Sequence, residues 1–253
     1  MTPRVDPATL FVGRIGNPTY LWPDFPDLKF ERSLWKKGLR WIGGIDEAGR
    51  GAWAGPVSAA VVILPRELSL SGCAIGNHSR TLRGVRDSKQ MTPLQREAWA
   101  PRIKEIALAW SVGFASAEEI DMLGIVPATR LAATRALESL LATSAGQSPD
   151  RQNPNPLILN LLIPDFLITD YLLLPDCSLP QTALVKGDRR ALTVAAASVL
   201  AKTARDALMR ELDGEYPGYG FARHKGYGTP QHRAALARLG MCSIHRKSFA
   251  IKA

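Results

Sequence analysis

The sequence predicts an α/β protein in which helices cover a central sheet. Short apolar runs typical of buried strands alternate along the 253 residues with longer segments whose apolar residues recur at helical spacing. Two of the apolar runs end in a carboxylate, Asp46 and Asp170. With 46% hydrophobic and 22% charged residues, the composition is that of an ordinary globular chain, long enough for one large domain or two small ones.

Local signals set the ends of the predicted elements. Pro93 suits the first turn of a helix. Ser116 and Glu119 match a capping box, so a short helix begins there and stops at Gly124, and Gly240 stops the last helix. The expected strands are 41–46, 57–64, 109–115, 166–169 and 183–185, and the expected helices are 30–37, 93–107, 116–124, 127–141, 192–212 and 230–239.

Three stretches show no clear period. Residues 1–29 are rich in proline and aromatic residues, and we expect an N-terminal extension that is loosely packed or disordered, followed by one domain over 30–253. Residues 68–81 predict an irregular loop with a short strand near 73–75. Residues 143–156, rich in Ser, Gly and Asn, predict a flexible loop.

The run Gly43 to Gly51 carries the first chemical signal. Asp46 and Glu47 stand together at the end of an apolar strand, where a carboxylate must be paired or bind a metal ion. Gly49 and Gly51 free the backbone for close approach of a ligand, and Arg50 adds a permanent cation between them. Side chains alternate along a strand, so both acids reach one site only if the strand bends or ends there. The simpler alternative is a helix-capping or surface acid pair before a turn.

Asp206 carries a second signal. It lies seven residues after Val199 on the helix 192–212, and therefore on the mostly apolar face of that helix. One reading is a carboxylate directed at the first strand. The other is a solvated acid paired with Lys202 at i,i−4.

The charge is strongly positive and uneven. Thirty-two Lys and Arg against 23 Asp and Glu give a net charge of +9, and no acidic residue follows Phe221. From Tyr216 to Thr229 aromatic residues, glycines and cations alternate. Aromatic rings can stack on sugars or bases while cations hold phosphates, so this part of the chain indicates a nucleic-acid binder. A merely solubilising basic tail is the alternative.

Compartment signals are few. No run of about 18 apolar residues predicts a membrane span, and the first residues lack the pattern of a signal peptide. The three cysteines, Cys73, Cys177 and Cys242, form no closely spaced pair and suit a reducing cytoplasm. We therefore expect a cytoplasmic protein with no membrane contact.

Several segments together resemble ribonuclease HII, the bacterial type 2 ribonuclease H. They appear in the order of that family and cover about residues 30–249. The segments are Gly44-Ile45-Asp46-Glu47-Ala48-Gly49-Arg50-Gly51, Gly55-Pro56-Val57, Asp87-Ser88-Lys89, Glu119-Ile120-Asp121, 195–202 with Arg205-Asp206, 219–229 and His245-Arg246-Lys247-Ser248-Phe249.

The resemblance implies a fold and a set of acids. The fold is RNase H-like, a central mixed sheet flanked by helices, with a helical C-terminal part over the substrate groove. The four acidic positions of the family carry over as Asp46, Glu47, Asp170 and Asp206. Tyr171 follows Asp170 where the family usually has glycine, and Asp165 and Asp176 flank that position. Asp188, in the sequence Lys-Gly-Asp, is a lesser rival for the fourth acid, because its loop context favours Asp206.

The chemistry of such a family suits carboxylates. Phosphodiester hydrolysis needs an activated water and a stabilised leaving oxygen, which two metal ions about 3.5–4 Å apart supply. Mg²⁺ and Mn²⁺ both take oxygen ligands, so either ion is expected. None of the four histidines is marked as an acid or base.

Substrate contacts also follow from the resemblance. The backbone at Gly49, Arg50 and Gly51 is expected around the ribose 2′-OH, the group that separates RNA from DNA. Tyr227 is expected on the neighbouring deoxyribose, where it would favour an RNA-to-DNA junction. The remaining candidates for contacts to the nucleic acid are Ser88, Lys89, Lys225 and Thr229, with Lys186 and Lys202 as weaker candidates for phosphate.

The resulting hypothesis is a monomeric endonuclease that cuts the RNA strand of RNA/DNA hybrids and cuts 5′ to a single ribonucleotide in duplex DNA. It would leave a 3′-OH and a 5′-phosphate. Two alternatives remain open: a ribonuclease HIII-like enzyme that needs runs of ribonucleotides, and a hybrid-binding protein without catalytic activity.

Overall fold

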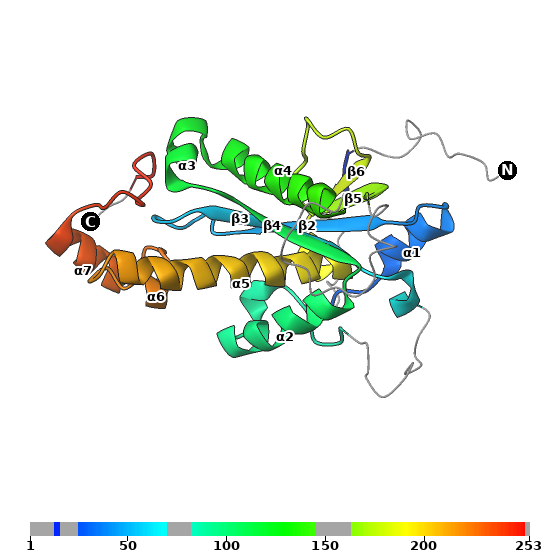
Figure 1. Cartoon of the computed structure of the whole chain (residues 1–253), viewed down its shortest axis with the longest axis horizontal. Coiled ribbons are helices and arrows are strands. Elements are labelled where there is room, and N and C mark those ends of the chain that lie inside the picture. Colours follow the sequence, from blue (N-terminus) through cyan, green and yellow to red (C-terminus); the bar gives the residue numbers. More distant parts are fainter. Residues whose placement is uncertain (1–12, 16–24, 70–81, 145–162, 251–253) are drawn as a thin grey trace.

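The computed structural model describes residues 13–15, 25–69, 82–144 and 163–250. In this part of the chain a single sheet is covered by helices on both faces (Figure 1). The loop predicted over 143–156 lies mostly outside the described residues, and the strand predicted near 73–75 lies wholly outside them. No helix of the described part has the length and apolar character needed to cross a membrane.

The sheet has six strands in the order β1-β6-β5-β2-β3-β4. Antiparallel pairing joins β2 to β3 and β3 to β4, while β2 with β5, β5 with β6 and β1 with β6 are parallel, so the sheet is mixed. The strands are β1 (Gly13–Ile15), β2 (Ile42–Ala48), β3 (Val57–Ile63), β4 (Ala109–Ala115), β5 (Phe166–Asp170) and β6 (Gln181–Leu184).

Two helical layers enclose the sheet. On one face lie α3 and α4, and on the other lie α5 and α2, with α6 and α7 beyond the C-terminal end of α5 (Figure 1). The helices are α1 (Lys29–Lys36), α2 (Pro93–Ile106), α3 (Ala117–Leu123), α4 (Ile125–Ser144), α5 (Leu192–Glu215), α6 (Phe221–His224) and α7 (Pro230–Leu239). Short 3₁₀ turns are η2 (Arg66–Ser69), η3 (Ser88–Gln90) and η5 (Gly187–Arg189).

A very close contact between layers joins α5 to β2. A Cβ added at Gly44 would lie 2.3 Å from the carbonyl carbon of Thr193, so only glycine lets the start of α5 lie this close to the strand. The facing part of α5 is built from small residues, Ala195 to Ala197 and Ala201, all fully buried. Small side chains on both elements therefore set the spacing of this layer.

Capping boxes begin two of the helices. At α2, Thr92 accepts from the backbone N–H of Gln95 and the Gln95 side chain accepts from the N–H of Thr92. Ser116 and Glu119 form the same reciprocal pair at α3. The capping box predicted at α3 is confirmed, and the helix ends at Gly124 as predicted.

Two elements were not predicted. The strand β1 lies inside the expected N-terminal extension and pairs in parallel with β6 at the edge of the sheet. The short helix α6 interrupts the stretch of alternating aromatic and basic residues. Neither has a periodic pattern long enough to be recognised from sequence.

The helix α1 is anchored through a buried acid. Glu31 is fully buried, and its Oε1 accepts hydrogen bonds from the N–H and the hydroxyl of Thr193 in the first turn of α5. The other oxygen, Oε2, has no hydrogen-bond partner among the described residues. Burial raises the pKa of Glu31 to about 7 from an ordinary value of 4.5, against the lowering effect of Thr193.

We expect Glu31→Gln to alter how stability depends on pH. Because the folded pKa lies above the unfolded one, the stabilisation from the protonated acid is complete below about pH 4.5 and is lost as pH rises through 7. Glutamine keeps the acceptor for Thr193 and does not ionise. Relative to the wild type, the variant should therefore gain about 2 kcal/mol between pH 5 and pH 8, the order set by about 1.4 kcal/mol per pKa unit.

Urea unfolding at pH 5 and at pH 8 measures this difference. Glu118→Gln is the matched control, because Glu118 is exposed in α3. Equal pH profiles for wild type and Glu31→Gln would show that Glu31 does not hold a proton in the folded state.

Candidate active site

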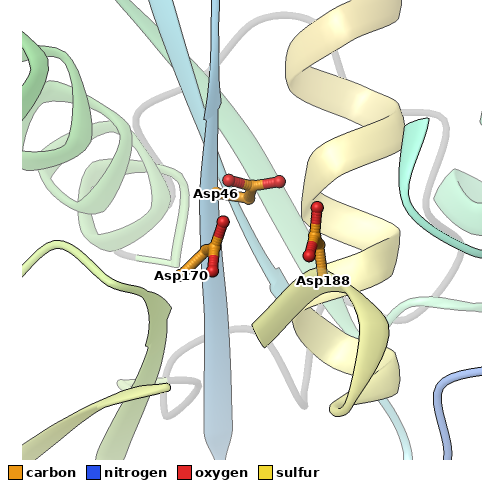
Figure 2. A group of neighbouring side chains, drawn as sticks. All are labelled: Asp46, Asp170 and Asp188. Carbon is orange, nitrogen blue, oxygen red and sulfur yellow. The ribbon is translucent and has the colours of Figure 1, made fainter. Parts of the chain in front are cut away.

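Three aspartates meet at one end of the parallel strands. Asp46 from β2, Asp170 from β5 and Asp188 from η5 each offer an oxygen atom, and these atoms all lie within 4.8 Å of one another. Figure 2 shows the three carboxylates directed toward a common point between the sheet and α5. Asp46 and Asp188 are both 4% exposed, and Asp170 is partly buried.

Strand pairing places these acids side by side. Ile45 of β2 pairs with Thr169 of the parallel strand β5, so Asp46 and Asp170 follow at matched positions. The backbone N–H of Gly187 donates to Oδ1 of Asp170 at 2.7 Å, which brings η5 and its Asp188 alongside. Sites at the carboxyl ends of neighbouring parallel strands are common in α/β proteins.

Tyr171, which stands where glycine was expected, adopts a glycine-like backbone. Its φ is +59°, in the left-handed region that favours glycine. Its side chain is 48% exposed. The turn after Asp170 is therefore made without glycine, and the tyrosine leaves Asp170 directed at the other two acids.

All three carboxyl groups have a pKa raised above the ordinary value for an aspartate. Burial raises the pKa of Asp46 well above its ordinary value, and Glu47, Asp170 and Asp188 raise it further. Burial likewise raises the pKa of Asp170, against the donated N–H of Gly187. The pKa of Asp188 is raised to about 7 by burial, Asp170 and Asp87.

The neighbouring cation is Lys89. Burial lowers its pKa, but the carboxylates of Asp46 and Asp188 outweigh that effect, and the pKa is raised. None of the ion pairs formed among the described residues involves Asp46, Asp170 or Asp188. Three converging oxygen donors that form no direct ion pair suit a hard divalent cation, so the residues present fit Mg²⁺ or Mn²⁺.

Glu47 leaves the strand on the opposite face from Asp46. Gly44 faces α5 and Ala48 packs in the cluster on that side, whereas Ile45 packs in the cluster that includes α4. The regular alternation that the sequence predicted is therefore kept, without a bend at Glu47. Its Oε1 accepts from Nη1 of Arg50 at 3.0 Å. Burial raises the pKa of Glu47, against the lowering effect of Arg50, and Asp170 adds to the rise.

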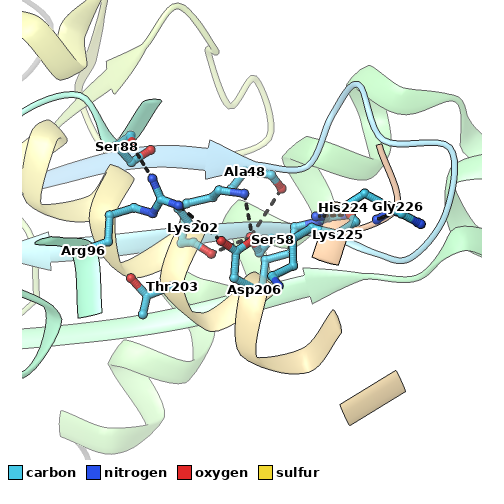
Figure 3. A network of polar contacts seen from close by, with 12 residues as sticks. Ala48, Ser58, Ser88, Arg96, Lys202, Thr203, Asp206, His224, Lys225 and Gly226 are labelled. Carbon is cyan, nitrogen blue, oxygen red and sulfur yellow. Dashed lines mark hydrogen bonds and ion pairs between the residues drawn. The ribbon is translucent and has the colours of Figure 1, made fainter. Parts of the chain in front are cut away.

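Asp206, the fourth acid carried over by resemblance, lies outside the group of three. Its carboxylate is paired with Nζ of Lys202 at 2.7 Å and with Nη2 of Arg96 at 3.6 Å (Figure 3). The Lys202 pair is the i,i−4 alternative considered from sequence. Arg96 also donates to the carbonyl of Ser88, so Asp206 holds the loop that carries Ser88 and Lys89.

Asp188 was the rival for that position, and the structure brings it into the group. The signal available in the sequence was its place in the chain. It follows β6, the parallel neighbour of β5, and immediately precedes the helix that crosses the sheet. Acids at the ends of adjacent parallel strands meet, whereas an acid inside a long helix need not.

Two buried arginines shape the surface next to the acids. Arg205 of α5 is fully buried and donates to the carbonyls of Ala54, Pro56 and Lys225. Arg246 is also fully buried and donates to the carbonyls of Arg50 and Gly55. A Cβ at Gly49, whose φ is +94°, would lie 2.0 Å from Nε of Arg205. The Gly49–Gly51 loop therefore rests directly on Arg205.

The remaining predicted contact residues differ in their surroundings. Tyr227 is half-buried, with its ring centroid 5.3 Å from Nζ of Lys202 and 5.5 Å from the guanidinium carbon of Arg205. Lys225 donates through Nζ to the carbonyl of Ala222. Ser88 is buried against Ser198, and Thr229 caps α7. In this structure the side chains of Ser88 and Thr229 both form hydrogen bonds within the protein.

Comparison with known proteins identifies the family of the chain. A family model described as ribonuclease HII matches residues 43–252. A ribonuclease HII of Synechococcus sp. (strain JA-3-3Ab) is 47% identical over 225 residues, covering 89% of this chain and 88% of the relative. A ribonuclease HII of Thermus thermophilus is 48% identical over 221 residues, covering 87% of this chain and 91% of the relative.

Solved structures show the same fold. The structure of the PCNA:RNase HII complex from Archaeoglobus fulgidus matches with a TM-score of 0.54 and 26% identity, over 84% of this chain and 96% of that chain. The mixed sheet and its two helical layers thus have a known counterpart. The chain belongs to the ribonuclease HII family and is an endoribonuclease H.

Proposed function

We propose that this endoribonuclease H cuts 5′ to a single ribonucleotide in duplex DNA as well as within RNA/DNA hybrids, leaving a 3′-OH and a 5′-phosphate. The observation that carries the proposal is the convergence of Asp46, Asp170 and Asp188 within 4.8 Å beside the Gly49–Gly51 loop. We take the chain to act as a cytoplasmic monomer, as expected from its sequence.

In the proposed site Asp46, Asp170 and Asp188 hold divalent cations. Glu47, which leaves the other face of β2, adds negative charge that acts on Asp46. Two Mg²⁺ or Mn²⁺ ions, when bound, would supply an activated water and stabilise the leaving oxygen. The protein's part is to bring the carboxylates together. The pKa of Asp188 is raised to about 7, so bound cations would displace a proton from this carboxyl near neutral pH.

The choice of substrate is proposed to rest on the neighbouring loops. Gly49 and Gly51 present backbone groups to the ribose 2′-OH. Arg246 holds that loop through the carbonyl of Arg50, and Arg205 packs directly against Gly49. Tyr227 is proposed to pack on the deoxyribose that follows. Lys89, which lies among the acids, is the better-placed candidate for a phosphate contact, because Lys225 donates to a carbonyl of its own segment.

We expect Asp46→Asn to abolish turnover while leaving the fold and hybrid binding intact. The substitution keeps the shape of the side chain and removes the charge at the centre of the group. Cleavage of a labelled hybrid with Mg²⁺ or Mn²⁺ measures turnover, and filter binding in Ca²⁺ measures affinity. Normal turnover by this variant would contradict the metal-holding role of Asp46.

A second comparison separates Asp188 from Asp206. We expect Asp188→Asn to lower kcat by at least about 100-fold, because it removes a cation ligand that acts in the transition state. Asp206→Asn should cost about tenfold, at the low end for a residue that acts through others, since Asp206 orients a loop through Arg96 and Lys202. The same substitution at both positions makes each the control for the other, and the reverse order of losses would restore Asp206 as the fourth acid.

The substrate proposal is tested on duplex DNA with one embedded ribonucleotide. We expect a single cut 5′ to the ribonucleotide, with a 3′-OH on the upstream fragment. The cut is mapped on sequencing gels, and the ends are identified by polymerase extension and phosphatase treatment. Cleavage of continuous hybrid alone would indicate ribonuclease HIII-like specificity, and binding without cleavage of either substrate would indicate a non-catalytic protein.

A further inference from the structure

A chain of buried histidines lies behind Tyr227 and has no part in the proposed cation site. His232 and His245 are at most 1% exposed, and His224 is 7% exposed. The rings of His224 and His232 stack with centroids 4.3 Å apart, and all three rings lie around Phe221. Three polar rings buried together must have their nitrogens satisfied.

The hydrogen bonds run in one line from the C-terminal segment to Tyr227. Nδ1 of His232 is 3.1 Å from the carbonyl oxygen of Tyr227. Nε2 of His232 is 3.1 Å from Nε2 of His245. Nδ1 of His245 in turn lies 2.9 Å from the backbone nitrogen of Cys242 and 3.1 Å from its sulfur.

The Tyr227 end of this line fixes the protons in it. A carbonyl oxygen only accepts, so Nδ1 of His232 carries a proton, and its Nε2 is an acceptor in the neutral ring. That acceptor needs a donor, which is the Nε2–H of His245. Nδ1 of His245 is then the acceptor in the neutral ring and takes the N–H of Cys242 at 2.9 Å, although the carbonyl of Cys242 also lies 3.3 Å away.

His224 follows the same rule. Its Nδ1 accepts from the N–H of Gly226 at 3.2 Å, and its Nε2 donates to the carbonyl of Tyr219 at 2.9 Å. Figure 3 shows the contact between His224 and Gly226 at the turn before Tyr227. Backbone groups thus hold His224 and His232 each in one neutral tautomer, and His232 in turn sets the tautomer of His245.

Protonation of His232 would break the line, because a charged His232 would place its Nε2–H against the Nε2–H of His245. The surroundings favour the neutral forms: burial lowers the pKa of His232 to about 4, helped by the other two rings and opposed by the accepting carbonyl of Tyr227. Burial also lowers the pKa of His224. The charge of Asp213 raises that pKa, and the charge of Lys225 lowers it.

We propose that His232 is a positioning residue for the substrate, and that His245 holds it in the tautomer that donates to Tyr227. By fixing the carbonyl of Tyr227, this line fixes the backbone from which the ring projects toward Lys202 and Arg205. It thereby sets the preference for an RNA-to-DNA junction. The inference rests on the role given to Tyr227 in the proposed function.

The test compares two substitutions at His232. In His232→Asn the amide nitrogen occupies the place of Nδ1 and always carries hydrogen, so it donates to Tyr227 without needing His245. In His232→Gln the amide lies near the place of Nε2, and the donor to Tyr227 is lost. The measured quantity is the ratio of kcat/KM on a duplex with one ribonucleotide to kcat/KM on a continuous hybrid.

We expect His232→Gln to lower this ratio about fivefold, the order expected for the loss of one neutral hydrogen bond. His232→Asn should keep it within about twofold of the wild type. Cys242→Ser is the matched control and should leave the ratio unchanged, because the backbone N–H at that position remains. Equal losses in the two His232 variants, or no loss in either, would overturn the inference.

Two further measurements separate the possible failures. If Tyr227→Ala leaves the ratio unchanged, the proposed role of Tyr227 is wrong and the inference fails with it. If Tyr227→Ala lowers the ratio and His232→Gln does not, only the inference is wrong.

In the wild-type protein, long-range ¹⁵N–¹H spectra at pH 7 should show neutral His232 protonated at Nδ1 and neutral His245 protonated at Nε2. The opposite tautomers or charged rings would overturn the inference even if a variant fails to fold.

Discussion

The close approach of α5 to β2 is the constraint on which the rest of the structure depends. It requires glycine at position 44 and small residues along the buried side of the helix. Because α5 begins directly after η5, this contact also fixes how near Asp188 comes to Asp46. A larger side chain at Gly44 would displace the helix and separate the acids at the same time. The packing of α5 on β2 and the geometry of the site therefore depend on the same contact.

The same helix supports the opposite end of the substrate surface. Arg205, more than three turns after Thr193, has its charge spread over three carbonyls rather than paired with an acid. A guanidinium suits this place because its donors form a rigid fan and it stays charged when buried. Arg246 performs a similar role from the C-terminal segment, which α3 holds through Asp121 by accepting from Lys247 and Ser248. Loops that are far apart in the sequence are therefore held together by these two buried arginines.

Much of this could be predicted from the sequence. Most of the strands and helices follow from periodicity and from end signals such as the capping box at Ser116, because those signals act locally. The edge strand β1 could not be predicted, since three residues carry no period and their pairing with β6 is decided by the rest of the sheet.

The acids of the site also divide into those whose place the sequence predicted and one whose place it did not. Asp46 and Asp170 stand at the ends of recognisable strands, and both reach the acidic group. Asp206 lies on the mostly apolar side of a helix, as its position predicted, yet it pairs with Lys202 and Arg96. Whether such an acid reaches a distant strand depends on how far along the helix it lies, and that is a matter of tertiary distance which helical periodicity does not contain.

The backbone of Tyr171 has a consequence for how such sites are recognised. Holding a non-glycine residue at φ +59° costs about 1–2 kcal/mol in the folded protein. A glycine would avoid that cost, but it would also give the unfolded chain more conformations to lose on folding, by roughly 0.4–1 kcal/mol. The second effect offsets about half of the first, and the small net cost is one that the folded protein bears, so the turn requires a left-handed conformation rather than a glycine. A search pattern that demands Asp-Gly at this strand end would pass over chains whose acid is held in the same geometry.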